Sequence, residues 1–286
     1  MAKWDAWIGR EKEQNDYLDL ALARRWSDTF DLALPNDGTM LQGIHFCLCT
    51  PEAPQSQLGE DGHPMRDNSD ASFFPPIPLP RRMWAASQIN FTRPLVIGKR
   101  INRRSRIISI SEKEGKTGSL GFVEVEHLTQ SENVTAIREK QTLVYRDSAG
   151  PDIPLSPPNV LSETFESSEW ENHKLFRPDP TLLFRFSALT FNTHRIHYDL
   201  PYSSDVERYR GLVVHGPLIA SLLLQMASES LGPNKLKSFA FRAVSPAIAN
   251  DSLHLVMRRK DAGSLELAAF AGDSRIIMRA SGSTAP

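Results

Sequence analysis

Cysteine is scarce in this chain of 286 residues, which contains only Cys47 and Cys49. A single residue separates the two, and no further cysteine is present to pair with either of them. Structural disulfides and four-thiolate zinc sites need more cysteines or a different spacing. We therefore predict that both thiols are reduced and buried.

Long apolar runs and an excess of one charge sign are also missing. No run approaches the ~20 apolar residues that a membrane-spanning helix needs, and the first residues lead into charged ones without a signal-peptide core. The net charge of -1 disfavours a nucleic-acid or anionic-membrane surface, because such surfaces need clustered positive charge. These absences predict a cytoplasmic protein that binds neither nucleic acid nor membrane.

The order of patterns along the chain indicates two modules of an α+β fold. Helical spacing is expected over residues 1–33 and 40–48, followed by strands at residues 87–92, 107–111, 121–127 and 135–145. The same order returns with helices over residues 180–187 and 217–231, followed by strands at residues 237–243, 253–258, 265–270 and 275–280. Because one domain usually has ~100–150 residues, we expect modules at residues 1–150 and 159–286, joined by a linker over residues 147–158. The proline-rich segment 51–80 is expected to be an ordered loop packed over a cleft.

Residues 190–199, called here the histidine loop, concentrate groups that can carry protons. Asn192, His194, His197 and Asp199 lie within eight residues of one another. Imidazole titrates near neutrality, so general acid–base catalysis is a natural use of the two histidines, although both could instead be structural. A metal site would need a third ligand such as Asp199 or His215, and the spacing matches no common zinc motif. No metal is therefore expected.

A helix start with a bare backbone N–H follows the histidine loop. Gly216 and Pro217 precede an apolar run that ends near Leu231, and proline suits the first helical turn. The free N–H groups of a helix start and the positive end of its dipole can stabilise a developing oxyanion. Glycine–proline is also a common way to begin a helix, so the motif alone does not establish a site.

Residues 192–199 and 214–217 together resemble the site of the MaoC-like, type-two enoyl-thioester hydratases, whose loop runs Asp-x-Asn-Pro-x-His-x-Asp. Residues 78–84 and 90–95 are similar to the dehydratase-like N-terminal module of the double members of that family. The resemblance implies a double hot-dog fold, in which each module has a long central helix wrapped by a curved antiparallel sheet. It also implies a hydro-lyase that reversibly hydrates an enoyl-CoA thioester, with short branched dicarboxylyl-CoA esters such as mesaconyl-C4-CoA or itaconyl-CoA as substrates.

The resemblance also implies roles for individual residues. His197 takes the catalytic histidine position and would activate water, while the Gly216 N–H would stabilise the enolate-like oxyanion. Asn192 stands where the family has its catalytic aspartate, and an amide can align a water molecule but cannot exchange its proton. Proton transfer would then depend on His197, alone or with support from His194 or Asp199.

The rest of the assignment concerns the substrate and its surroundings. The N-terminal module would shape the acyl pocket, which leaves one active site per chain. No cofactor is expected, because coenzyme A is part of the substrate, and we expect a homodimer. The free carboxylate of a dicarboxylyl substrate would need a cation, ideally an arginine. The candidates are Arg185, Arg195 and Arg242, with Arg81, Arg82 and Trp84 lining the cleft or meeting the phosphates of coenzyme A. Each arginine could instead form a surface or structural ion pair.

Other functions remain open at this stage. A 3-hydroxyacyl-CoA or acyl-carrier-protein dehydratase of fatty-acid-type metabolism would want an apolar tunnel without a cation. A non-catalytic acyl-CoA-binding protein is compatible with the amide at position 192. A metal-dependent hydrolase is the most distant alternative.

Overall fold

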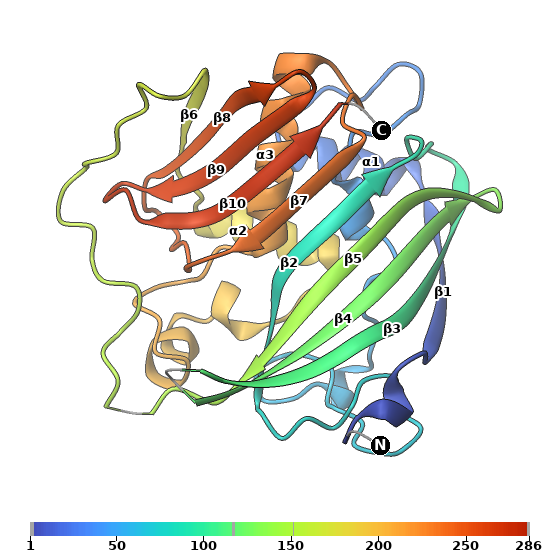
Figure 1. Ribbon diagram of the computed structural model, residues 1–286, viewed down its shortest axis with the longest axis vertical. Coiled ribbons are helices and arrows are strands. Elements are labelled where there is room, and N and C mark those ends of the chain that lie inside the picture. The colour runs from blue at the N-terminus through green and yellow to red at the C-terminus, as the bar shows by residue number, and fades with distance from the viewer. Residues whose placement is uncertain (1–2, 116–117, 151, 285–286) are drawn as a thin grey trace.

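One continuous antiparallel sheet joins the two halves of the molecule. The computed structural model describes residues 3–115, 118–150 and 152–284. Within these residues ten strands form a sheet in the order β1-β3-β4-β5-β2-β7-β10-β9-β8-β6. The strands of each half stay together, and the halves meet where β2 pairs with β7 (Figure 1).

In each half, one strand with the helices and turns is followed by a run of four consecutive strands. The N-terminal half has 3-10 turns at Asp5–Trp7, Ile44–Cys47 and Gln55–Gln57, strands β1 (Glu11–Leu18), β2 (Arg81–Phe91), β3 (Lys99–Gly115), β4 (Gly118–Ser131) and β5 (Val134–Arg146), and helix α1 (Leu20–Thr29). The C-terminal half has β6 (Asn172–Phe176), α2 (Pro180–Thr190), a 3-10 turn at Arg195–His197, a π-helical turn at Tyr202–Val206, α3 (Gly216–Leu231), β7 (Ser238–Ala243), β8 (Leu253–Asp261), β9 (Ser264–Ala271) and β10 (Ile276–Ser283).

Helix α3 is the centre of the C-terminal half, as its apolar sequence predicts. Every side chain from residue 218 to residue 227 is buried, because the helix packs against β8 and β9 and is covered on its other sides as well. Gly232, at φ 94°, stops the helix in a conformation that suits glycine. The large core around α3 contains residues of both halves, among them Trp26, Ile89 and Leu218. The two halves therefore share one core.

The predicted helix over residues 1–33 is only partly correct. Residues 1 and 2 lie outside the described residues, β1 occupies part of the segment, and α1 begins after Asp19, whose carboxylate accepts a hydrogen bond from the N–H of Leu22. In β1, Glu11 lies opposite Arg106 and Glu13 lies opposite Arg104 of β3. Such cross-strand pairs of opposite charge stabilise a sheet edge. They come from residues far away in the sequence, so local periodicity could not reveal them.

The prediction of a buried helix over residues 40–48 is also wrong. The segment is buried, but only Ile44–Cys47 form a 3-10 turn. Gly43 precedes the turn at φ 111°, and a Cβ there would lie 3.5 Å from Ser221 Oγ on α3. Among the described residues the N-terminal half thus has no helix as long as α3, so the prediction of a long central helix in each module is wrong for this half. Cys47 and Cys49 are free and buried, as predicted.

The remaining predicted elements are present. Helix α2 and the strands β7, β8, β9 and β10 match the predicted segments closely, while β2 to β5 extend beyond them. In β3 much of the extra length is charged, and a cross-strand ion pair of Arg106 with Glu11 of β1 supports it. Strand β6 and the π-helical turn were not predicted. The linker over residues 147–158 contains no helix or strand where it is described, and none of the described helices is long and apolar enough to cross a membrane.

Candidate active site

The histidine loop begins at the end of α2, where the chain turns sharply. Phe191 has a left-handed backbone with φ 48°, and the N–H of Asn192 then donates to the carbonyl of Ser187 at 2.9 Å. The Asn192 side-chain oxygen accepts a hydrogen bond from the N–H of His194 at 3.0 Å, which is the geometry of an Asx turn. No hydrogen bond is formed by the amide nitrogen of Asn192 within the described residues. The side chain therefore shapes the loop with one atom and keeps a donor available.

His197 is held as a neutral base. Its Nδ1 lies 2.6 Å from the carbonyl oxygen of Val213, so Nδ1 must carry the proton and Nε2 keeps its lone pair. Burial, and to a smaller extent the nearby His194, lower the pKa of His197 to about 3, against the opposing effect of the hydrogen bond to Val213. The imidazole is therefore neutral at pH 7 and able to accept a proton.

The ring of His197 lies next to the start of α3. It stacks on the ring of His215 with centroids 3.5 Å apart and an interplanar angle of 18°. His215 hydrogen-bonds to Ser187 Oγ at 2.8 Å and directly precedes Gly216. No side chain caps the first turn of α3, and a Cβ added at Gly216 would meet only the Trp84 carbonyl oxygen, at 4.0 Å. The structure thus brings His197 to the uncapped start of α3.

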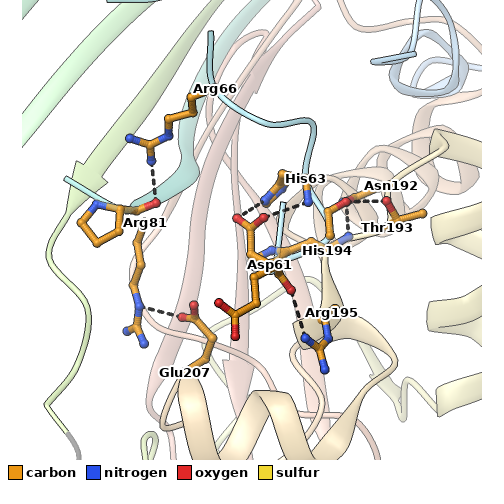
Figure 2. A network of polar contacts seen from close by, with 12 residues as sticks. Asp61, His63, Arg66, Arg81, Asn192, Thr193, His194, Arg195 and Glu207 are labelled. Atoms are coloured by element: carbon orange, nitrogen blue, oxygen red, sulfur yellow. Dashed lines mark hydrogen bonds and ion pairs between the residues drawn. The ribbon is translucent and has the colours of Figure 1, made fainter. Parts of the chain in front are cut away.

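His194 links the stacked rings of His197 and His215 to a further imidazole, that of His63, which the sequence analysis did not identify. The ring of His194 lies edge-on to His197 with centroids 5.5 Å apart, and lies 4.1 Å from the ring of His63. His63 Nδ1 and Asp61 Oδ2 are 3.0 Å apart (Figure 2). Burial opposes ionisation of Asp61, but the hydrogen bonds and charge of His63 lower its pKa to about 2. Burial also lowers the pKa of His194 to about 3, with the charges of His63 and Arg82 adding to the shift.

The segment that carries Asp61 and His63 is the proline-rich loop of the N-terminal half. The N–H of Arg195 donates to the Asp61 carbonyl at 2.9 Å, and Thr193 Oγ1 donates to the Gly62 carbonyl at 2.5 Å. At Gly62, with φ 84°, a Cβ would lie 2.0 Å from the Thr193 carbonyl oxygen. Only glycine fits so close to the histidine loop. The loop is ordered and packs over the site, as expected. In the sequence, the Asp-Gly-His run at residues 61–63 was the one local indication that this loop contributes side chains to the site.

One group of side chains in the described residues has metal-ligand spacing. Ligand atoms of Asp61, His63 and His194 lie within 4.8 Å of one another. The third ligands considered from the sequence lie elsewhere, because Asp199 pairs with Arg195 and His215 with Ser187. Asp61 and His63 already satisfy each other by a hydrogen bond, so the geometry does not require an ion, and the absence of a metal stays a prediction.

Arg195 and Asp199 hold the loop rather than face an open space. Arg195 Nε and Nη2 lie 2.9 and 2.7 Å from Asp199 Oδ2, and the guanidinium lies over the ring of Tyr202 at 4.2 Å. Asp199 also accepts a hydrogen bond from the N–H of Tyr202 at 3.1 Å, and Arg195 Nη1 donates to the Glu60 carbonyl. Both side chains are therefore occupied by contacts that fix the histidine loop and the π-helical turn after it.

The other predicted cations are distributed between the surface and the interior. Arg185 is exposed and donates to the Asp28 carbonyl at 3.3 Å, and Arg242 is exposed on β7. Neither is brought to the histidine loop. Arg81 is buried in an ion pair with Glu207 at 2.7 Å.

Arg82 and Trp84 lie on the side of the site that β2 provides. Arg82 lines a cavity of about 220 Å³ next to His63, with its guanidinium 5.3 Å from the ring centroid of Phe74. Trp84 Nε1 donates to Ser87 Oγ at 2.9 Å, and its backbone oxygen is the atom that faces Gly216. Of the cations expected to meet substrate, Arg82 is the one that the structure places on a cavity near the histidine loop.

Known proteins resemble this chain in sequence and in fold. A model of the hydroxyacyl-thioester dehydratase type 2 family matches residues 43–249. A mesaconyl-C(4)-CoA hydratase of Chloroflexus aurantiacus is 42% identical over 248 residues, covering 86% of this chain and 85% of its own length. A mitochondrial hydroxyacyl-thioester dehydratase type 2 of Schizosaccharomyces pombe is 28% identical, covering 82% of this chain and 83% of its own length.

Solved structures show the same architecture. A MaoC-like dehydratase of Phytophthora capsici superposes with a TM-score of 0.70 at 13% identity, covering 96% of this chain and 95% of its own. A Mycobacterium tuberculosis protein with a double hot-dog fold superposes with a TM-score of 0.58 at 15% identity, covering 96% of each chain. The predicted double hot-dog fold is therefore confirmed. The chain belongs to the hydroxyacyl-thioester dehydratase type 2 family, whose members are hydro-lyases acting on acyl thioesters.

Proposed function

We propose that this protein reversibly hydrates a short branched dicarboxylyl-CoA ester, of which mesaconyl-C4-CoA is the first candidate. The observation that carries the proposal is the neutral His197, fixed through Nδ1 and stacked on the residue that precedes the start of α3. The relative from Chloroflexus aurantiacus, a mesaconyl-C(4)-CoA hydratase, supports the choice of substrate.

The reaction needs a base for water and a stabiliser for the negative charge on the thioester oxygen. His197 Nε2 takes a proton from water, whose oxygen then attacks the β-carbon of the conjugated double bond. The electrons of that double bond move onto the thioester carbonyl, where the Gly216 N–H and the α3 dipole stabilise the enolate-like oxygen. The proton returns to the α-carbon, so one water molecule is added in total. Dehydration is the reverse of these steps.

Asn192 has a supporting part in this scheme. Its side-chain oxygen is committed to the N–H of His194, and its amide nitrogen is left to hold the water oxygen. An amide does not exchange the proton, so His197 carries the transfer. The scheme uses no metal and no cofactor apart from the coenzyme A of the substrate.

We further propose a cytoplasmic homodimer that works without membrane or nucleic acid. Double hot-dog chains already contain the paired modules of a hot-dog dimer and often pair again, which supports the dimer. Sedimentation equilibrium would test the oligomeric state directly.

The function is tested by a hydration assay on a panel of CoA esters. Consumption of mesaconyl-C4-CoA, itaconyl-CoA and crotonyl-CoA and formation of their hydrated esters would be followed by liquid chromatography, with the wild type and a His197→Ala variant. Faster turnover of the dicarboxylyl esters, lost in the variant, supports the proposal. Faster turnover of crotonyl-CoA would favour a fatty-acyl dehydratase, and no turnover of any ester by the wild type would refute the hydratase.

A further inference from the structure

We propose that Arg82 binds the free carboxylate of the substrate, in a subsite between β2 and the proline-rich loop. The inference rests on the proposed function, because only a dicarboxylyl ester carries such a group. It adds the residue and the cavity that would select this substrate class over simple enoyl esters.

The cavity lies in the right place for this task. It has a volume of about 220 Å³, and Asp61, His63, Arg66, Pro80 and Arg82 contribute to its wall. The ring of His63 lies 4.1 Å from His194, whose ring lies 5.5 Å from that of His197. In mesaconyl-C4-CoA the free carboxylate is bonded to the β-carbon, which is the carbon that water attacks. A carboxylate subsite must therefore lie near the catalytic histidine, and this cavity is connected to His197 through the rings of His63 and His194.

The charges on the cavity wall are not balanced. Arg66 donates only to backbone carbonyls, those of Ile77, Leu79 and Pro80, with distances from 2.5 to 3.1 Å. The guanidinium of Arg82 has an aromatic neighbour, Phe74, and no carboxylate partner among the described residues. Two cations thus face a single carboxylate on this wall, that of Asp61.

Asp61 does not neutralise Arg82. One of its carboxylate oxygens accepts the backbone N–H of His63 at 3.0 Å, and the other lies 3.0 Å from the ring nitrogen of His63. Both oxygens are therefore engaged within their own turn. The charge of Arg82 reaches the histidine loop instead, where it contributes to the lowered pKa of His194 after burial and the charge of His63.

The two arginines have different parts to play. The Nη atoms of Arg66 hold the chain that leads into β2, so Arg66 contributes positive charge and fixes the wall (Figure 2). Arg82 is half-buried and keeps its donors available. A planar guanidinium can make two parallel hydrogen bonds to a carboxylate, which a lysine cannot reproduce. Arg81, its neighbour in sequence, points into the interior and is already paired with Glu207.

The test compares Arg82→Gln and Arg82→Lys with the wild type, and uses Arg242→Gln as a matched control on an exposed strand position. Binding of succinyl-CoA, a saturated dicarboxylyl ester, and of butyryl-CoA, its neutral counterpart, would be measured by calorimetry. We expect Arg82→Gln to weaken succinyl-CoA binding by ~10- to 100-fold, as expected for the loss of a charged hydrogen-bond donor, with butyryl-CoA unchanged within ~3-fold. Arg82→Lys should give an intermediate loss, and the control should bind both esters like the wild type.

These binding measurements separate the subsite from the reaction. Equal weakening of both esters in Arg82→Gln, or no weakening of either, would overturn the subsite, provided the thermal unfolding of the variant matches that of the wild type. Selective loss of succinyl-CoA binding supports the subsite even if the wild type fails to hydrate mesaconyl-C4-CoA, which would refute only the proposed reaction.

Discussion

Replacing His197 with asparagine should remove catalysis while leaving the fold intact. The imidazole has two functions in the proposed scheme, because Nδ1 donates to the Val213 carbonyl at 2.6 Å and Nε2 is the proposed base. An asparagine side chain can place its amide nitrogen near the position of Nδ1 and keep the hydrogen bond to Val213. It has no group that can accept a proton at the position of Nε2. The substitution therefore separates the structural function from the catalytic one.

The expected effect of His197→Asn on the reaction rate is much larger than its effect on the free energy of unfolding. Loss of a general base usually lowers the rate by ~10²- to 10⁴-fold, which corresponds to ~3–5.5 kcal/mol in the activation free energy. His197→Ala should lose the same activity and, in addition, leave the buried Val213 carbonyl without its partner, which costs ~1–3 kcal/mol of unfolding free energy. The asparagine variant should keep most of this unfolding free energy, because it keeps the hydrogen bond to Val213.

Two measurements on the same preparations decide the matter. Hydration kinetics on mesaconyl-C4-CoA give kcat and KM, and urea unfolding gives the free energy of unfolding. A kcat within ~10-fold of the wild type in His197→Asn would refute the assignment of His197 as the base, since that loss is below the usual range for a general base. Similar destabilisation of both variants would show that the contact with Val213 is not what the imidazole contributes to stability.

Three further outcomes are expected. Asn192→Asp should leave activity unchanged, because a carboxylate can accept the His194 N–H with one oxygen and hold the water with the other by accepting its O–H, whereas Asn192→Ala should abolish it; equal loss in both would indicate a packing role. Gly62→Ala should lower both activity and stability, because its Cβ would lie 2.0 Å from the neighbouring Thr193 oxygen, and wild-type kinetics would show that the loop contact is dispensable. Burial lowers the pKa of His45 and of His127 to about 3, so the unfolded chain takes up protons first as the pH falls below ~6.5. The free energy of unfolding from urea titrations should therefore decrease between about pH 6.5 and pH 3, by ~1.4 kcal/mol per pH unit for each of the two imidazoles, and equal stability at pH 8 and pH 5.5 would contradict this.

Local sequence patterns were most informative where a segment is buried on all sides. Helix α3 could be predicted because its apolar run is bounded by Pro217 and Gly232, which begin and end helices for reasons internal to the chain. Strand β1 could not, because its charged residues are stabilised by the opposite charges of β3, about ninety residues later. The histidine loop could be proposed as a site because its candidate groups are adjacent in sequence.

The part of the site that comes from a distance was missed. Gly62 and Thr193 touch although 131 positions separate them, so no spacing rule connects Asp61 and His63 with the histidine loop. The neighbouring arginines show a related limit. Arg81 and Arg82 point to opposite faces of β2, as adjacent residues of a strand must. Only the position of Glu207 determines that Arg81 is the neutralised member of the pair.

The asymmetry of the two halves supports the proposal of a single site per chain. An oxyanion site of this type needs the aligned N–H groups and the dipole of a long helix, and α3 provides sixteen residues of it. In the N-terminal half the described segment that packs against α3 is a 3-10 turn of four residues, entered through a left-handed glycine, Gly43. Such a turn has too few aligned peptides to stabilise an enolate. Because this half contributes Asp61, His63 and Arg82 to the surroundings of the histidine loop, the proposed function assigns substrate selection to it and the chemistry to the C-terminal half.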